Sequence, residues 1–425
     1  MRKKRIVYLD HAATTPTDPR VRRVMNDSLR ENFGNPGSLH QAGQKSSASV
    51  FKSRRQIADS IDADYKELIF TGSATEANNL ALCGAAENFY SRSRFQNRKP
   101  KARIIVSAIE HESVQGAARE LEKKGFEIIT LPVLRSGLVD LGALKRSLDK
   151  NTILVSVGYA NNEVGVVQPI AEIAEIIRRF KDKNEVFLNM LPTSPRTSNS
   201  PTGGSNKYPL FHTDAVQAFQ YLNCAVSELG VDFMTLSAHK IYGPKGIGAL
   251  YVRLPGNKKE IGLNSYPLKP LIFGGGQEFG LRSGTENVAA IAGFAEAVKI
   301  AKSKRDQETM RLAKLRDYFF NRLKKINSKL KINGSRQFRL PNNLNIYFPD
   351  VDVSTLLTEL DLNGVAAAAG SACRARLVEP SPVLTAMGFP LKRSGSSIRF
   401  SLGRGTTRAD IDYAVKVISA ARLEK

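Results

Sequence analysis

The feature that most constrains the fold is an alternation of short β-branched segments with longer segments of helical periodicity. Six short apolar segments predict strands, over residues 67–71, 103–107, 127–131, 152–158, 233–237 and 248–252. Helices are predicted between them, over residues 75–86, 113–124 and 170–180. Such alternation is typical of an α/β domain on a mainly parallel sheet. The carboxyl ends of parallel strands line the ligand crevice in sheets of this kind.

The pattern changes after about residue 290. Residues 295–326 predict one or two long amphipathic helices, because their apolar side chains recur at spacings of three and four. Antiparallel strands are expected at 343–348 and 397–401. We therefore predict a large domain over residues 18–298, and a smaller α+β domain formed by residues 299–425 together with 1–17.

One segment fits neither domain. In residues 189–209, 16 of 21 residues are Pro, Ser, Thr, Gly or Asn. This composition has too little apolar surface to offset the entropy of ordering. We predict a flexible insertion there.

Composition excludes several classes of protein. With 425 residues, 42% hydrophobic and 24% charged, the chain has the composition of a globular protein. It contains no apolar run of the roughly 18 residues that a membrane span needs. No long apolar segment follows the basic start, so a secretory signal is not predicted and a cytoplasmic location is expected. Three cysteines provide neither a disulfide framework nor zinc-binding spacing, and no metal site is predicted.

The chain is strongly basic, with 63 Lys and Arg against 40 Asp and Glu, a net charge of +23. Such a balance favours anionic partners such as phosphorylated cofactors, nucleic acid or acidic proteins. The basic residues are dispersed, however, and the densest run, residues 92–103, lacks the interleaved aromatics of single-strand binders. Direct nucleic-acid binding is therefore not predicted.

Three motifs together indicate a cofactor site. Lys240 follows a predicted strand and precedes a glycine-rich turn, where a buried lysine can attack an aldehyde. Asp214 lies about 25 residues upstream and suits a protonated pyridine nitrogen, although it could instead cap the next helix. Residues 71–77 (TGSATEA) place small and hydroxyl residues before a helix, which suits a phosphate or an ordinary capping box. Combined, they predict a site for pyridoxal phosphate (PLP).

Further motifs extend over nearly the whole chain. They are residues 8–16 (YLDHAATTP), 33–36 (FGNP), 110–111 (EH), 160–165 (ANNEVG), 237–246 (SAHKIYGPKG), 274–285 (GGGQEFGLRSGT), 370–373 (GSAC) and 397–404 (SIRFSLGR). In this order and spacing the chain resembles the cysteine desulfurases of the NifS/IscS type, PLP enzymes of the class V aminotransferase group. The resemblance implies fold type I, with a mainly parallel seven-stranded sheet between helices and a smaller α+β domain.

The resemblance also implies roles for cofactor-binding residues. Lys240 would bind the cofactor covalently, and Asp214 would pair with its pyridine nitrogen. Gln217 and Asn162 would bond near its phenolic oxygen. The phosphate would be held by Thr75, Ser237 and His239 together with the backbone near Ala74. Thr285 would reach the phosphate in the other subunit, which implies a homodimer.

Substrate and sulfur-handling residues follow from the same resemblance. His111 would stack on the cofactor ring and act in acid–base chemistry. Arg399 would bind the substrate carboxylate, a task that suits a guanidinium group, and Asn35 would also contact substrate. Cys373 would accept sulfur, and the neighbouring Arg374 and Arg376 favour its thiolate. The other cysteines, Cys83 and Cys224, lie in apolar settings and are predicted to be buried.

The implied reaction converts L-cysteine to L-alanine and leaves the sulfur on Cys373 as a persulfide. The sulfur would pass to an acceptor protein, either an iron–sulfur scaffold or a tRNA- or cofactor-thiolation protein. Three alternatives stay open: a selenocysteine, cystine or cysteine-sulfinate lyase on the same fold, a plain aminotransferase, and an inactive basic protein that binds nucleic acid.

Overall fold

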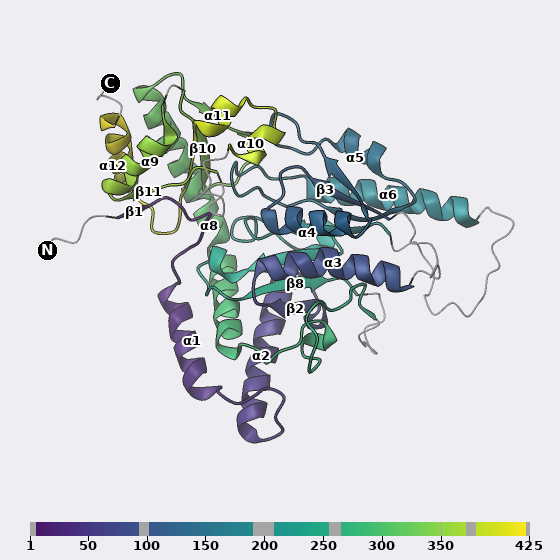
Figure 1. The fold of residues 1–425 in the computed structure, drawn as a ribbon. Helices are drawn as coiled ribbons and strands as arrows, with labels where there is room; N and C mark the ends of the chain where they lie inside the picture. Colours follow the sequence, from purple (N-terminus) through teal and green to yellow (C-terminus); the bar gives the residue numbers. More distant parts are fainter. Residues whose placement is uncertain are drawn as a thin grey trace.

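A seven-stranded sheet lies between helices at the centre of the molecule (Figure 1). The computed structural model describes residues 6–92, 102–189, 208–254, 265–349, 351–370 and 380–421. Within them the sheet has the order β2-β8-β7-β6-β5-β3-β4. Its strands are β2 (Leu68–Thr71), β3 (Arg103–Ser107), β4 (Glu127–Leu131), β5 (Thr152–Ser156), β6 (Leu210–Asp214), β7 (Phe233–Ser237) and β8 (Gly248–Val252). Strands β3 to β7 pair in parallel, and β8 is antiparallel to both of its neighbours. The prediction of a mainly parallel sheet is confirmed.

Both faces of this sheet are covered, which explains its nearly continuous apolar strands. All five residues of β5, β7 and β8 are buried. Alternate residues of β3 belong to different cores: Ile104 and Val106 lie in the cluster that includes α3 and α4 residues, and Ile105 in the cluster that includes α6 and α8 residues. The strand ends are thereby held rigidly between two layers of helices.

The helices divide between the layers around the sheet and the C-terminal part of the chain. Their bounds are α1 (Pro19–Glu31), α2 (Gln41–Asp59), α3 (Ala74–Arg92), α4 (Glu112–Lys123), α5 (Leu141–Ser147), α6 (Ile170–Asn189), α7 (Val226–Leu229), α8 (Val288–Ile326), α9 (Val353–Leu362), α10 (Pro382–Ala386), α11 (Leu391–Gly395) and α12 (Arg408–Ala420). Helices α1 and α2 extend away from the sheet and pack on α8 (Figure 1). Among the described residues no helix is long and apolar enough to cross a membrane.

The C-terminal part is built on α8 and two small sheets. Helix α8 is a single helix of 39 residues, and the predicted domain boundary at 298 and 299 falls inside it. Strand β10 (Asn343–Tyr347) pairs antiparallel with β12 (Ser397–Ser401) and with β9 (Lys331–Ile332). The N-terminal strand β1 (Val7–Tyr8) pairs in parallel with β11 (Val365–Ala366). The first residues of the chain are thereby brought beside its last third.

Several local predictions need correction. Glu67 belongs to a 3-10 turn, Tyr65–Glu67, closed by a capping box with Asp64, so β2 starts one residue later than predicted. Strand β5 ends at Ser156, two residues before its predicted end. Cys83 is half-buried, whereas Cys224 is buried as predicted.

The region of the predicted insertion is described only at its edges. Helix α6 continues to Asn189, nine residues past its predicted end, because the helical pattern persists beyond residue 180. Tyr208 packs edge-on against Phe89, 5.3 Å between ring centroids, directly before β6. Residues 190–207 lie outside the described part of the chain. Strand β6 itself was not among the six predicted strand segments.

Candidate active site

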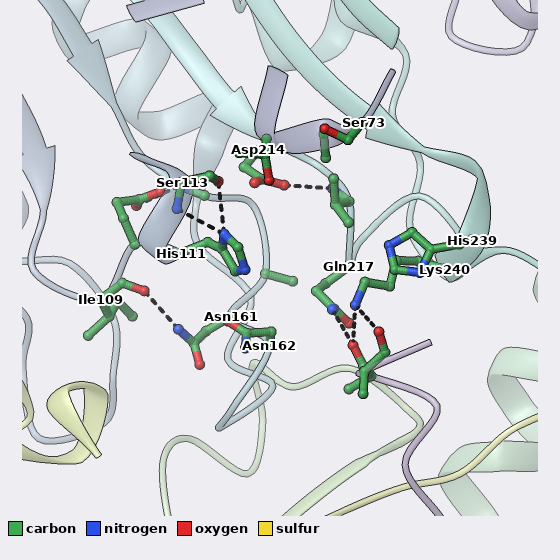
Figure 2. Close-up of a pocket in the computed structure, with 18 of the residues that line it drawn as sticks. Ser73, Ile109, His111, Ser113, Asn161, Asn162, Asp214, Gln217, His239 and Lys240 are labelled. Atoms are coloured by element: carbon green, nitrogen blue, oxygen red, sulfur yellow. Dashed lines mark hydrogen bonds between the residues drawn. The ribbon is translucent and has the colours of Figure 1, made fainter. Parts of the chain in front are cut away.

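One pocket lies where the strands of the central sheet end, and it collects residues from seven parts of the chain (Figure 2). Asp214 is the last residue of β6, and Lys240 ends a 3-10 turn, Ala238–Lys240, directly after β7. His111 is the N-cap of α4, which follows β3. Parallel strands present their carboxyl ends at one edge, so residues far apart in sequence converge there.

Most of the predicted site residues line this pocket. They are Ala74, Thr75, His111, Asn162, Asp214, Gln217, His239, Lys240 and Arg399. Ser237 is buried at the end of β7 and is not among the residues that line the pocket. Asn35 and Thr285 are exposed, and Asn35 lines a separate hollow together with Gln277 and Glu286. Cys373 lies outside the described residues.

Lys240 is held by the backbone of the N-terminal segment. Its Nζ donates to the carbonyl oxygens of Ala12 and Ala13, each at 2.6 Å. The side-chain amide of Gln217 donates to the same Ala12 oxygen at 3.0 Å (Figure 2). Residues near the start of the chain therefore form the wall that positions the reactive amine.

Asp214 points into the pocket from the end of β6 and accepts two hydrogen bonds. Oδ2 accepts from Asn78 Nδ2 at 2.8 Å, and Oδ1 accepts from the Val216 amide at 2.9 Å. A carboxylate has further lone pairs, so a third donor from within the pocket can be bound as well. Asp214 can therefore accept the hydrogen bond of the local turn and still contact a ligand.

The start of α3 forms one end of the pocket. Ser73, Ala74 and Thr75 line it, and the first N–H groups of a helix have no partner inside the helix. A Cβ at Gly248 would lie 2.7 Å from the Ser73 carbonyl carbon, so this helix start packs directly on β8. Helix α3 is 19 residues long, and the N-terminus of such a helix is suited to binding phosphate.

His239 lines the pocket beside the turn that carries Lys240. Its Nδ1 is 3.1 Å from the Thr14 hydroxyl. Burial, followed by the positive charges of Lys240 and Lys245, lowers the pKa of His239 to about 4. The ring is therefore neutral at neutral pH and can serve as a hydrogen-bond donor to an anion.

Glu110 is a pocket residue to which the sequence analysis assigned no role. It is half-buried, and its Oε1 accepts from the Gly158 amide at 2.8 Å. Its Oε2 has no hydrogen-bond partner in the described part of the chain. Burial, with a smaller contribution from Asp214, raises the pKa of Glu110 to about 8. No sequence signal marks this burial, because Glu110 sits between residues typical of a strand end and a helix start.

Replacing Glu110 with Gln is expected to change how stability depends on pH. The folded pKa of about 8 lies above the ordinary value of 4.5, so Glu110 contributes stability below pH 4.5 and loses it as pH rises through 8. The stability of the wild type relative to Glu110→Gln should fall by up to about 1.4 kcal/mol per pH unit in this window. Urea unfolding at several pH values measures the difference. A constant difference across the window would contradict a raised pKa.

Arg399 enters the pocket from β12, in the C-terminal part of the chain. It is only 1% exposed, and its Nη2 pairs with Asp10 Oδ1 at 2.7 Å. Its Nη1 donates to the Asn162 carbonyl at 3.1 Å, and its Nε has no partner among the described residues. Because guanidinium has several N–H donors, a ligand carboxylate can still be bound. Arg399 is therefore both an ion-pair partner and a candidate ligand contact.

The chemical groups that line this pocket suit PLP. The pocket offers an amine for the aldehyde, a carboxylate for a cationic ring nitrogen and a helix start for the phosphate. A half-buried imidazole, His111, and the guanidinium of Arg399 complete the walls. The arrangement can hold an amino acid beside the cofactor.

The chain matches known proteins over nearly its whole length. The class V aminotransferase family matches residues 7–187 and 205–414. A cysteine desulfurase IscS from Dictyoglomus turgidum is 41% identical over 415 residues, which are 98% of this chain and 94% of that protein. The chain belongs to the cysteine desulfurase family. The predicted family, enzyme class and PLP cofactor are thereby confirmed.

Solved structures show the same fold. A NifS-like protein superimposes with a TM-score of 0.82 at 33% identity, covering 98% of this chain and 99% of that chain. SspA in complex with cysteine gives a TM-score of 0.73 at 31% identity, covering 93% and 98%. The enzyme therefore has PLP fold type I, as predicted.

Proposed function

We propose that this enzyme removes sulfur from L-cysteine, releases L-alanine and carries the sulfur on Cys373 as a persulfide. The observation that carries the proposal is the convergence of Lys240, Asp214, His111 and Arg399 on one pocket. Bound PLP supplies an electron sink for negative charge that develops at the substrate Cα. The IscS relatives and the cysteine-bound SspA structure support L-cysteine as the substrate.

Some of the pocket side chains bind the substrate or the cofactor, and others transfer protons. Arg399 holds the substrate carboxylate and thereby orients the Cα–H bond. Lys240 Nζ takes the proton from Cα, and Asp214 keeps the ring nitrogen protonated. Thr75 and the Ala74 backbone at the α3 start, with Ser237 and His239, would hold the cofactor phosphate. Gln217 and Asn162 would contact the ring near its phenolic oxygen.

The sulfur step conserves atoms and electrons. The Cys373 thiolate attacks the substrate sulfur, so that an S–S bond forms while the substrate Cβ–S bond breaks. The electron pair of the broken bond stays with the carbon fragment, which takes up a proton and leaves as alanine. His111 contacts the substrate side of the pocket in this step. The sulfur on Cys373 then passes to an acceptor protein, an iron–sulfur scaffold or a thiolation protein.

We also infer a homodimer. Asn35 and Thr285 are exposed and do not line the pocket, which supports a role for them across an interface. Large apolar side chains in the same two segments of the chain are exposed to solvent: Phe33 is 78% exposed, Leu39 90% and Phe273 81%. A second copy of the chain that covers these side chains would place the partner subunit's Thr285 at the phosphate. A cytoplasmic location completes the proposal, supported by the absence of a disulfide framework in the cysteine content.

The test is a single turnover with L-cysteine, comparing wild type with Cys373→Ala and the matched control Cys83→Ala. We expect alanine and a persulfide on Cys373 in the wild type and the control, and loss of both in Cys373→Ala. Amino-acid analysis follows alanine, and mass spectrometry locates the persulfide. Equal alanine production by Cys373→Ala would indicate a lyase that bypasses the thiol. An absence of turnover in the PLP-loaded wild type would refute cysteine as substrate.

A further inference from the structure

A chain of hydrogen bonds behind the pocket connects Asp214 to His111 through two residues outside the predicted site. Asn78 Nδ2 is 2.8 Å from Asp214 Oδ2 and also 2.8 Å from Ser113 Oγ. Ser113 Oγ is in turn 2.8 Å from His111 Nδ1. Asn78 comes from α3 and is fully buried, whereas Ser113 lies in the first turn of α4.

The orientation of the Asn78 amide follows from its neighbours. An ionised Asp214 carboxylate accepts hydrogen bonds and cannot donate them. The nitrogen of the amide must therefore face Asp214, because the opposite orientation would place two acceptor oxygens together. The second hydrogen of the same nitrogen then points to Ser113 Oγ. Ser113 Oγ is thus an acceptor from Asn78 and must direct its own hydrogen elsewhere.

The protonation of His111 follows from the next link. The Ser113 backbone N–H donates to His111 Nδ1 at 3.1 Å, the N-cap contact of α4. The Ser113 hydroxyl hydrogen has the same Nδ1 within reach at 2.8 Å (Figure 2). A nitrogen that accepts from two donors cannot carry a hydrogen itself. In a neutral ring the hydrogen must therefore be on Nε2.

We propose that Asn78 and Ser113 are positioning residues that hold His111 as the Nε2–H tautomer. Nε2 has no hydrogen-bond partner among the described residues, and His111 lines the pocket. In this tautomer the ring offers its N–H to a ligand and can donate a hydrogen bond to negative charge on the substrate. Neutral histidines at helix N-termini serve other enzymes in this way.

The Asn78 amide also connects the His111 N–H donor to Asp214, the residue proposed to pair with the cofactor's ring nitrogen. Since one nitrogen of Asn78 bonds both Asp214 and Ser113, the Asp214 carboxylate is connected to the His111 imidazole through Asn78 and Ser113. The tautomer is a property of the chain. Only the role of His111 in the reaction rests on the proposed function.

The test measures the tautomer by ¹⁵N NMR of the histidine-labelled holoenzyme, with His111→Gln to identify the His111 signals. We expect a protonated Nε2 and an unprotonated, hydrogen-bonded Nδ1. Ser113→Ala should weaken the Nδ1 hydrogen bond and lower kcat by about 2–10-fold with KM unchanged. Ser113→Thr keeps the hydroxyl and should restore both the NMR signature and kcat.

Several results would overturn the inference. A hydrogen on Nδ1 in an active wild type would refute the tautomer. An unchanged NMR signature and kcat in Ser113→Ala would refute the role of the hydroxyl. If the wild type shows the Nε2–H signature but makes no alanine from cysteine, the tautomer assignment is supported and the proposed function fails instead.

Discussion

Replacing Lys240 with Ala is expected to abolish turnover of L-cysteine. The variant loses the amine that binds the cofactor and the group that moves the Cα proton. Loss of the proton transfer alone costs about 10²–10⁴-fold in rate. The visible absorption of the lysine-bound cofactor should disappear as well. Both readouts are measured on protein purified in the presence of PLP.

The matched control for this variant is Lys302→Ala, an exposed lysine of α8 far from the pocket. It removes the same charge and should leave absorption and turnover unchanged. Turnover within about tenfold of wild type in Lys240→Ala would mean that another group moves the proton.

Replacing Arg54 with Met is expected to lower the free energy of unfolding more than any other substitution proposed for this protein. Arg54 forms a two-pronged ion pair with Glu278, with both N–O distances at 2.6 Å. Glu278 is 5% exposed and also accepts from the Phe70 amide at 2.8 Å. The Arg54 guanidinium lies 4.6 Å from the Phe70 ring and 5.1 Å from the Phe279 ring. Removal of one partner leaves a buried charge, which typically costs about 3–5 kcal/mol.

The stability loss in Arg54→Met is measured by urea unfolding. The exposed neighbour Arg55→Met is its control and should change stability by no more than about 0.5 kcal/mol. The double variant Arg54→Met with Glu278→Gln should recover part of the loss, because the buried charge is then removed as well. A loss below about 1 kcal/mol in Arg54→Met would show that water reaches Glu278.

The ion pair also reaches the candidate interface. Glu278 and Phe279 adopt left-handed backbone angles, φ 52° and 59°, within the loop that leads to Thr285. Such conformations cost energy for residues other than glycine and persist where surrounding contacts enforce them. Arg54 supplies one of these contacts. The loop that precedes Thr285 is therefore held at Glu278 and Phe279 by a residue of α2.

Much of the fold could be predicted because its strands are short and apolar. Residues 103–107, 127–131, 233–237 and 248–252 form strands with the predicted bounds. A strand end is expected at Asp214, and β6 ends there, but no bounds were predicted for this strand, since it directly follows the polar stretch 189–209 and its own sequence includes His212 and Asp214. His212 is tolerated there because Ser156 Oγ and Thr235 Oγ1, from the flanking strands, bond its ring at 2.8 and 3.1 Å.

The sequence by itself determined the chemistry of the pocket. Lys240 and His111 follow predicted apolar strands and Asp214 ends β6, and the carboxyl ends of parallel strands meet at one edge of the sheet. The partners of these groups were decided only by the tertiary structure. Asn78 lies 136 residues from Asp214, and Asp10 lies 389 residues from Arg399, yet each pair is in hydrogen-bond contact. Burial sets the pKa of Glu110 in the same way, because desolvation depends on what packs around the carboxyl group and not on its neighbours in sequence.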